Sequence, residues 1–135
     1  MSSLPLRCVT PYFELIAHED VVNVRRTARP FASLAEVEAA AARVVGVLTP
    51  GPRAARMLVD LREKTALADM GFEARLSEYR RTLVGLADRV AVITDLEQVR
   101  ASLRDLPAAE AGAVRMFDDA PSALAWLGVA SRTAA

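Results

Sequence analysis

Few side chains in this sequence are suited to catalysis. Cys8 is the only cysteine and His18 the only histidine, so an internal disulfide bond cannot form and the clustered ligands of a typical zinc site are missing. His18 precedes Glu19 and Asp20 in a polar segment typical of an exposed turn. The sequence contains no GxxxxGK(S/T) or GxGxxG loop for a nucleotide phosphate. We therefore predict no catalytic residue, no metal site, no cofactor and no enzymatic activity.

Residues 62–75 offer a different kind of chemistry, the recognition of a partner. They combine charged residues with Thr65 and Gly71, and they follow the apolar run Met57–Leu61, which is typical of a buried strand. Binding sites of open α/β sheets form beyond the carboxyl ends of the strands, so we expect the candidate site in this segment. Asp69 also has a structural interpretation, because aspartate is a preferred N-cap and suits a helix that begins at Met70.

Apolar side chains that recur every three or four residues predict a helix over residues 72–86 after this segment. Arg80 and Arg81 stand on this helix together with acidic residues such as Glu73 and Glu78. Mixed charges at these spacings are typical of a solvent-exposed helix face with weak ion pairs. We therefore expect the charges in solvent and the apolar side of the helix against a sheet.

The elements that must position this segment begin with a hairpin. Alternating apolar residues predict strands at 12–16 and 20–25, joined by the turn at His18. Ser33 and Glu36 have the spacing of a capping box, which predicts a helix from this point to about Leu48.

Strands and helices alternate in the rest of the chain. Apolar runs predict strands at 57–61, 89–94 and 113–117. Asp95 is the expected cap of a helix after the second of these strands, and Asp118 or Asp119 is expected to open a last helix that ends at Gly128.

This order predicts an α/β fold. The sheet is expected to be mostly parallel, with about five strands, an N-terminal hairpin and about four covering helices. Residues 11–128 are expected to form a single domain, whereas residues 1–10 and 129–135 are expected to be a flexible N-terminus and a flexible tail.

Composition excludes several classes of protein. The 135 residues are 53% hydrophobic and 25% charged, which is too apolar a composition for a disordered chain. The 17 basic and 17 acidic side chains cancel, which disfavours nucleic acid as a partner. No apolar stretch is long enough to span a bilayer or to act as a secretory signal, so we expect a cytoplasmic protein without membrane insertion.

The segment after the central strand resembles the STAS domain, the sulfate transporter and anti-sigma factor antagonist family. When Asp60-Leu61 is laid on the Asp-Leu that ends the family's central strand, Gly71 falls on the glycine of its Asp-Ser-Ser/Thr-Gly motif. Asp69 then occupies the position of the phosphorylated serine. The ending at residues 115–127, with Phe-Asp-Asp and Ala-Trp-Leu, is similar to the divergent STAS-like branch related to the sporulation antagonist.

This resemblance implies a STAS-like fold and a non-catalytic regulatory or scaffolding module that binds another protein, either a regulatory kinase-like protein or another STAS-containing protein. A phosphorylated serine carries about −1.5 to −2 charge that can be removed, whereas aspartate holds about −1 permanently. The resemblance therefore implies that the phosphosite-equivalent Asp69 has lost the family's switch. The partner-binding residues that it implies are Arg62, Lys64, Thr65, Asp69, Met70, Gly71 and Arg75.

Two alternatives stay open. STAS-like domains can self-associate, which implies a self-assembling structural unit that forms a homo-oligomer. The divergent branch is also similar to lipid-carrier folds, which implies a domain that binds a small hydrophobic ligand or a lipid between its sheet and its helices.

Overall fold

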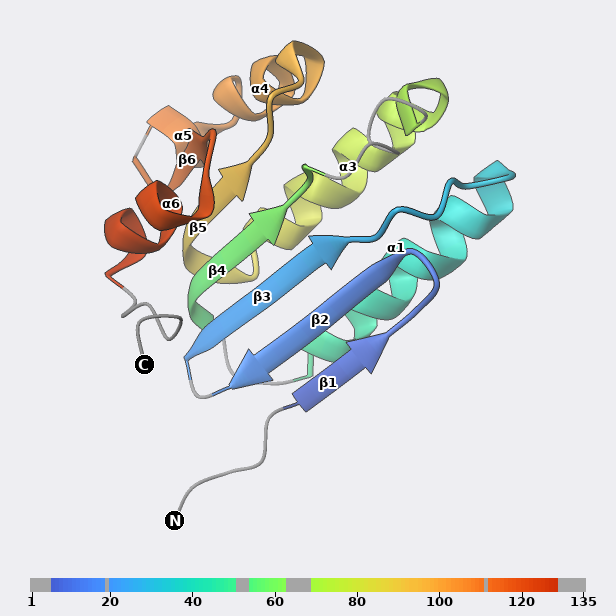
Figure 1. Ribbon diagram of the computed structural model, residues 1–135, viewed down its shortest axis with the longest axis horizontal. Helices are drawn as coiled ribbons and strands as arrows, with labels where there is room; N and C mark the ends of the chain where they lie inside the picture. Colours follow the sequence, from blue (N-terminus) through green and yellow to red (C-terminus); the bar gives the residue numbers. More distant parts are fainter. Residues whose placement is uncertain (1–5, 19, 51–53, 63–68, 111, 129–135) are drawn as a thin grey trace.

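The computed structural model describes residues 6–18, 20–50, 54–62, 69–110 and 112–128. These residues form one sheet of six strands in the order β1-β2-β3-β4-β5-β6 (Figure 1). Strands β1 to β3 are antiparallel neighbours, whereas β3 to β6 run parallel. The strands are β1 (Leu6–Val9), β2 (Phe13–His18), β3 (Val21–Arg26), β4 (Ala54–Asp60), β5 (Ala87–Ile93) and β6 (Val114–Phe117).

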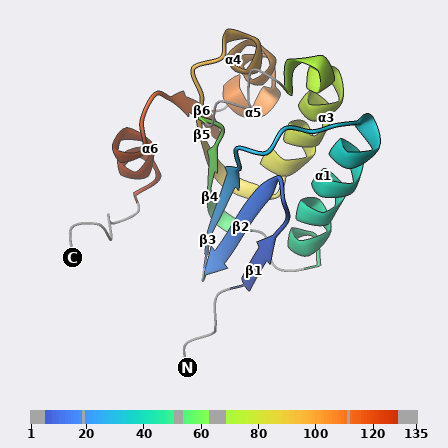
Figure 2. The same ribbon diagram turned by 45° about the vertical axis from the view of Figure 1, so that its right-hand side comes forward.

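Helices cover both faces of the sheet. Figure 2 shows α6 on one side of the sheet and α1 and α3 on the other, and α4 adds residues to the same core as α1 and α3. Within the described ranges, no helix is both long and apolar enough to cross a membrane. The helices are α1 (Leu34–Leu48), the 3-10 turn η1 (Asp69–Phe72), α3 (Glu73–Val84), α4 (Glu97–Arg104), α5 (Pro107–Glu110) and α6 (Ala120–Leu127).

Three clusters of buried residues hold these layers together, and the smallest of them includes Phe31, Val37 and Leu76. The largest core lies between the sheet and helices α1, α3 and α4, and it includes Leu15, Val44 and Val59. A second core lies under α6, where Leu58 and Leu127 are packed. Neighbouring residues of β4 such as Leu58 and Val59 therefore point to opposite layers, as the alternation of a strand requires.

The predicted α/β class, the mostly parallel sheet and the N-terminal hairpin are confirmed. The sheet has one strand more than expected, because Leu6–Val9 pair with β2 and bury Cys8 opposite Leu15. Leu6–Val9 are therefore part of the sheet and not of a flexible N-terminus, which corrects that prediction. Four residues are too few to show an alternating pattern, and their strand depends on hydrogen bonds to β2. The tail at 129–135 lies outside the described residues.

Two predicted N-caps are confirmed. At the start of α1, the Ser33 hydroxyl accepts a hydrogen bond from the Glu36 backbone N–H at 3.3 Å. At the start of α6, the Asp119 carboxylate accepts one from the Ser122 backbone N–H at 2.7 Å. The predicted end of α6 is confirmed as well, because Gly128 adopts a φ of 76°, which glycine allows without steric cost.

The predicted cap of the helix after β5 is wrong. Helix α4 begins at Glu97 with Leu96 at the N-cap position, and no side chain caps it. The Leu96 backbone N–H instead donates to the hydroxyl of Thr94 at 3.2 Å. Thr94 is 1% exposed, so its hydroxyl needs a local partner, which the Leu96 N–H provides.

Asp119→Ala is expected to reduce the acid sensitivity of α6. The Ser122 backbone N–H, and then the Ser122 side chain, hold the pKa of Asp119 below its usual value. A carboxyl group whose pKa is lowered by folding stabilises the folded state above the ordinary carboxyl pKa, and this contribution is lost as the pH falls through the lowered value. We expect the variant to melt at a lower temperature than the wild type at neutral pH, and the gap to close in acid. Thermal denaturation at both pH values measures this, and an equal gap at both would contradict it.

Candidate functional site

The described part of the segment after β4 begins with an ion pair. Arg62 Nη2 lies 2.7 Å from Asp60 Oδ2. Its Nε and its backbone N–H donate to Asp60 Oδ1 at 3.0 and 3.1 Å. Burial acts to raise the pKa of Asp60, but the hydrogen bonds from Arg62 outweigh this effect and hold that pKa below its usual value. Arg62 is therefore held against the end of its own strand.

Arg75 of α3 forms ion pairs with acidic side chains of α1 and of its own helix. Its Nε donates to Glu38 Oε1 of α1 at 2.9 Å, and its guanidinium also pairs with Glu78. The guanidinium carbon lies 4.8 Å from the centre of the Tyr79 ring. Arg75 thus links α1 to α3, and the described structure does not bring it together with Arg62.

The other predicted partner-binding residues fall in three groups. Gly71 is exposed within η1. Lys64 and Thr65 lie outside the described residues, as do the side chains of Asp69 and Met70. The structure therefore leaves the predicted partner surface untested.

The predicted helix start in this segment is wrong. Asp69 begins the 3-10 turn η1, and the α-helix α3 begins at Glu73 with Phe72 at its N-cap and no side-chain cap. A 3-10 turn supplies hydrogen bonds three residues apart before the α-helical pattern is established. This turn shifts the start of the α-helix from Met70 to Glu73.

A pocket lined by apolar side chains lies between the sheet and helices α1 and α3. Its wall includes Val24 of β3, Val59 of β4 and Val44 of α1. Leu61 and Leu96, which follow β4 and β5, also line it. The pocket thus lies at the carboxyl edge of the parallel strands, where open α/β sheets bind their ligands.

Arg26 is a buried charged residue in the wall of this pocket. It is 2% exposed, because β3 turns Val22, Val24 and Arg26 toward the helix layer. Arg26 Nη1 donates to the backbone carbonyls of Tyr12 at 3.2 Å and Thr27 at 2.9 Å. These carbonyls hold a fixed positive charge at the edge of an apolar pocket.

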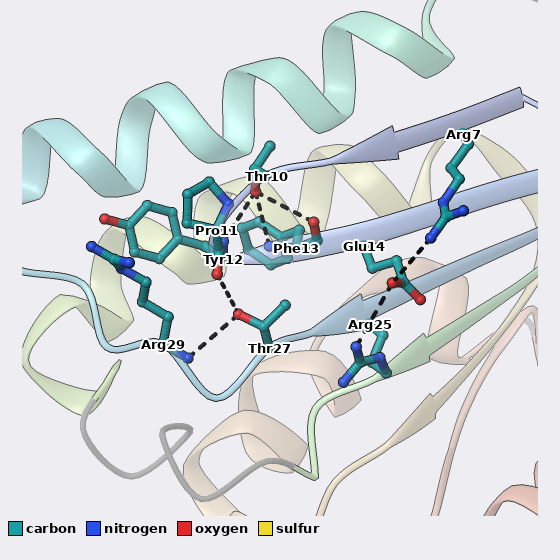
Figure 3. A network of polar contacts seen from close by, with 9 residues as sticks. All are labelled: Arg7, Thr10, Pro11, Tyr12, Phe13, Glu14, Arg25, Thr27 and Arg29. Carbon is teal, nitrogen blue, oxygen red and sulfur yellow. Dashed lines mark hydrogen bonds and ion pairs between the residues drawn. The ribbon is translucent and has the colours of Figure 1, made fainter.

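The corner between β1 and β2 fixes one of these carbonyls (Figure 3). Thr10 Oγ1 accepts hydrogen bonds from the backbone N–H groups of Tyr12 at 3.2 Å and Phe13 at 2.9 Å. The Thr27 hydroxyl donates to the Pro11 carbonyl at 2.5 Å, and the Thr27 backbone N–H donates to the Tyr12 carbonyl at 2.9 Å. The end of β3 and the start of β2 are therefore joined around Arg26.

Glu73 and Arg80 of α3 form an ion pair in the wall of the pocket. Their side chains are 18% and 12% exposed, so the prediction that they lie on a solvent-exposed face is wrong. Both line the pocket together with Leu76 and Leu83, and helical spacing puts all four on one side of α3. Among the described residues, Arg80 Nε is the one buried side-chain nitrogen or oxygen for which no hydrogen-bond partner is found.

This pocket was not predicted from the sequence, although two signals in the sequence point to it. Arg26 follows Val22 and Val24 at the spacing that a strand buries on one face. Glu73 and Arg80 share the helical spacing of Leu76 and Leu83. A charged residue at an inward position is a signal of a functional or structural site.

Three charged side chains stand among the apolar ones in the described part of the pocket wall. Two arginines, Arg26 and Arg80, and one carboxylate, Glu73, line it. Among the described residues, His, Cys, Asp and Glu side chains form no group of three or more that could hold a metal ion.

Comparisons of this chain with protein-family models, with curated proteins and with solved structures found no match. The resemblance to STAS domains therefore stays a prediction from the sequence, and the pocket is the feature of the described structure that bears most directly on function.

Proposed function

We propose that this chain is a non-catalytic binding domain for a small molecule with an apolar body, which lies in the pocket between the sheet and helices α1 and α3. The composition of the pocket carries the proposal. Apolar side chains of the sheet and of the helices make up most of its wall, and Arg26, Glu73 and Arg80 add a few polar groups. Most small-molecule sites in proteins combine an apolar wall with few polar groups in this way.

The position of the pocket supports the same proposal. It lies at the carboxyl edge of β3 and β4, and the N-terminal half of α3 lines it through Glu73 and Leu76. Ligands of open α/β sheets bind at this edge because the loops and helix starts that follow the strands converge there.

The regulatory protein-interaction role that the STAS resemblance implies has less support. Residues 63–68, in the middle of the implied partner surface, lie outside the described residues. Arg62 and Arg75 are paired with acidic side chains of their own chain. Binding to a protein partner through this segment, and self-assembly, stay predictions from the sequence.

Filling the pocket tests the proposed function. Val45 of α1 lines the pocket and is only half-buried, so a larger side chain at this position can enter the pocket without displacing the core. We expect the wild-type protein to bind the neutral fluorescent probe N-phenylnaphthylamine saturably. We expect Val45→Phe to bind this probe about tenfold more weakly or worse, a loss of about 1.4 kcal/mol in binding free energy.

Ala42→Phe is the matched control. Ala42 is exposed on the same helix and does not line the pocket, so the same aromatic side chain there should leave the affinity for the probe unchanged. Circular dichroism verifies that both variants are folded. Equal affinity in all three proteins, or no saturable binding to the wild type, would contradict the proposed function.

A further inference from the structure

We propose that two copies of this chain pair through their β1 strands, antiparallel and centred on Cys8, so that the two sheets become one. Strand β1 lies at the edge of the sheet, and β2 is its one neighbour among the described strands (Figure 1). An edge strand presents backbone N–H and C=O groups that can pair with another strand. The proposal rests neither on the pocket nor on the resemblance to STAS domains.

The hydrogen-bonding pattern of the hairpin determines which backbone groups of β1 face outward. The Thr10 backbone N–H donates to the Phe13 carbonyl at 2.9 Å. Hydrogen-bonded and non-hydrogen-bonded positions alternate along antiparallel strands. Cys8, two residues before Thr10, is therefore bonded to β2. The backbone N–H and C=O groups of Arg7 and Val9 point away from β2, toward the open edge.

These outward groups match those of a second copy in one antiparallel register. With Cys8 opposite Cys8 of the second copy, Arg7 lies opposite the second copy's Val9, and the two residues exchange their backbone hydrogen bonds. A shift of two residues in one direction sets Arg7 opposite Arg7, and like charges directly opposite are unfavourable. A shift in the other direction sets Arg7 opposite Pro11, which has no N–H to donate. The register centred on Cys8 avoids both.

The opposite edge of the sheet lacks this match. The Val90 backbone N–H donates to the Ala113 carbonyl at 2.8 Å, so Val114 and Met116 are the residues of β6 that face outward. The register that pairs both of them with a second copy sets Arg115 directly opposite Arg115 of that copy, which is unfavourable. Strand β1 is therefore the edge that suits a second copy better.

Exposed apolar side chains at the β1 edge support the pairing. Val9 and Ile16 are 55% and 37% exposed, and they are two of the three large hydrophobic side chains that are exposed among the described residues. Both lie on the face of the sheet that α6 covers only over β4, β5 and β6. In the proposed register, the alkyl part of Arg7 from the second copy lies beside Val9 and covers it. The Arg7 side chain is 65% exposed and available for this contact.

Sedimentation equilibrium of the full chain tests the proposal. An interface of one short strand is smaller than a standard interface, so we expect a weak dimer with a dissociation constant of about 100 µM. Val9→Pro removes an N–H that β2 does not use, and edge strands tolerate proline at such positions. It takes away half of the hydrogen bonds between the copies, so we expect the dissociation constant to rise about tenfold or more. Val9→Ile keeps the N–H and an apolar side chain, and this matched control should leave the constant unchanged.

Val9→Lys tests the same contact without altering the backbone. The introduced cation lies opposite Glu14 of its own β2, which suits the monomer, but opposite Arg7 of the second copy in the dimer. We expect a dimer several fold weaker than the wild type at low salt, and a smaller difference at high salt because salt screens exposed charges. Circular dichroism verifies that each variant is folded.

Cys8 reports the register. The two Cys8 residues form a non-hydrogen-bonded pair in the proposed dimer, where Cα atoms are about 4.5 Å apart, a separation that a disulfide bond allows. Diamide should therefore oxidise the two thiols to one disulfide, while diamide itself takes up both hydrogens and is reduced to the hydrazine. We expect a cross-linked dimer of the wild type on a non-reducing gel, much less of it for Val9→Pro, and none for Cys8→Ser.

Four outcomes would contradict the proposal. The first is a wild-type protein that stays monomeric at millimolar concentration. The second is a dimer that Val9→Pro and Val9→Lys leave unchanged, because it must use another surface. The third is growth beyond the dimer, which indicates head-to-tail pairing of β1 with β6. The fourth is a dimer that forms without the Cys8 cross-link, which overturns the register.

Discussion

Phe31→Ala is expected to lower the free energy of unfolding by about 3–5 kcal/mol, the usual cost of truncating a buried aromatic residue. Phe31 lies between β3 and α1 and is only 8% exposed. Its ring stacks on Tyr12 with centroids 4.5 Å apart, and it also contacts the rings of Phe13 and Phe72 at 6.1 and 6.3 Å. Removing it would leave a cavity among three rings and beside Arg26. Urea denaturation followed by circular dichroism measures this loss.

Leu34→Ala is the control for this truncation. Leu34 begins α1 three residues later and is 49% exposed, so the same kind of change should alter the free energy of unfolding by about 0.5 kcal/mol or less. Similar losses in the two variants would mean that the aromatic cluster does not hold the end of β3 against α1.

Arg26→Met is expected to lower the free energy of unfolding by about 2–4 kcal/mol, although methionine keeps most of the apolar volume. The Thr27 carbonyl would lose the donor that lies 2.9 Å away. Phe31 would lose the cation above its ring, which is 4.3 Å from the ring centre. Urea denaturation measures this loss.

Arg25→Met provides the matched comparison on the opposite face of β3. Arg25 lies 3.9 Å from Glu14, which is also 3.9 Å from Arg7 (Figure 3), and the Arg25 side chain is 41% exposed. Exposed ion pairs contribute little, so we expect a loss of about 1 kcal/mol or less in the free energy of unfolding. If Arg25→Met and Arg26→Met destabilise the protein equally, the account of Arg26 as a buried anchor is wrong.

Local signals predicted the elements of this fold well. Ser33 and Asp119 cap helices because each side chain reaches a backbone N–H three residues ahead, a distance that the sequence itself specifies. The signal at Gly128 is local as well, because the positive φ that ends α6 belongs to this one residue. The predicted order of strands and helices from residue 12 onward followed from such signals and from apolar periodicity.

Features that depend on distant contacts were not predicted. Strand β1 exists because it pairs with β2, and Leu6–Val9 alone carry no strand pattern. Asp95 was expected to cap a helix, but no side chain caps α4. The buried hydroxyl of Thr94 accepts a hydrogen bond from the Leu96 backbone N–H just before this helix. The burial of Arg80 depends on how α1, α3 and the sheet pack, so mixed charges along α3 were assigned to solvent.

The candidate site also depends on contacts between residues that are distant in the sequence. The partner-binding site expected at residues 62–75 stays a prediction, whereas the pocket at the carboxyl edge of β4 is lined mainly by residues outside that segment, such as Leu61. The charged residues that define it come from β3 and α3, which are 47 or more positions apart in the chain. Only the sheet register and the packing of α3 bring Arg26 near Glu73 and Arg80.

The central claim is that an apolar ligand enters the pocket between the sheet and helices α1 and α3. An NMR titration of methyl-labelled protein with N-phenylnaphthylamine tests it most directly, because the aromatic probe shifts the methyl signals nearest to it. We predict large shifts for Val24, Val44, Val59 and Leu83, which line the pocket, and none for Leu58 and Leu127 under α6. Shifts under α6 with an unchanged pocket, or no shifts at saturating probe, would contradict the claim.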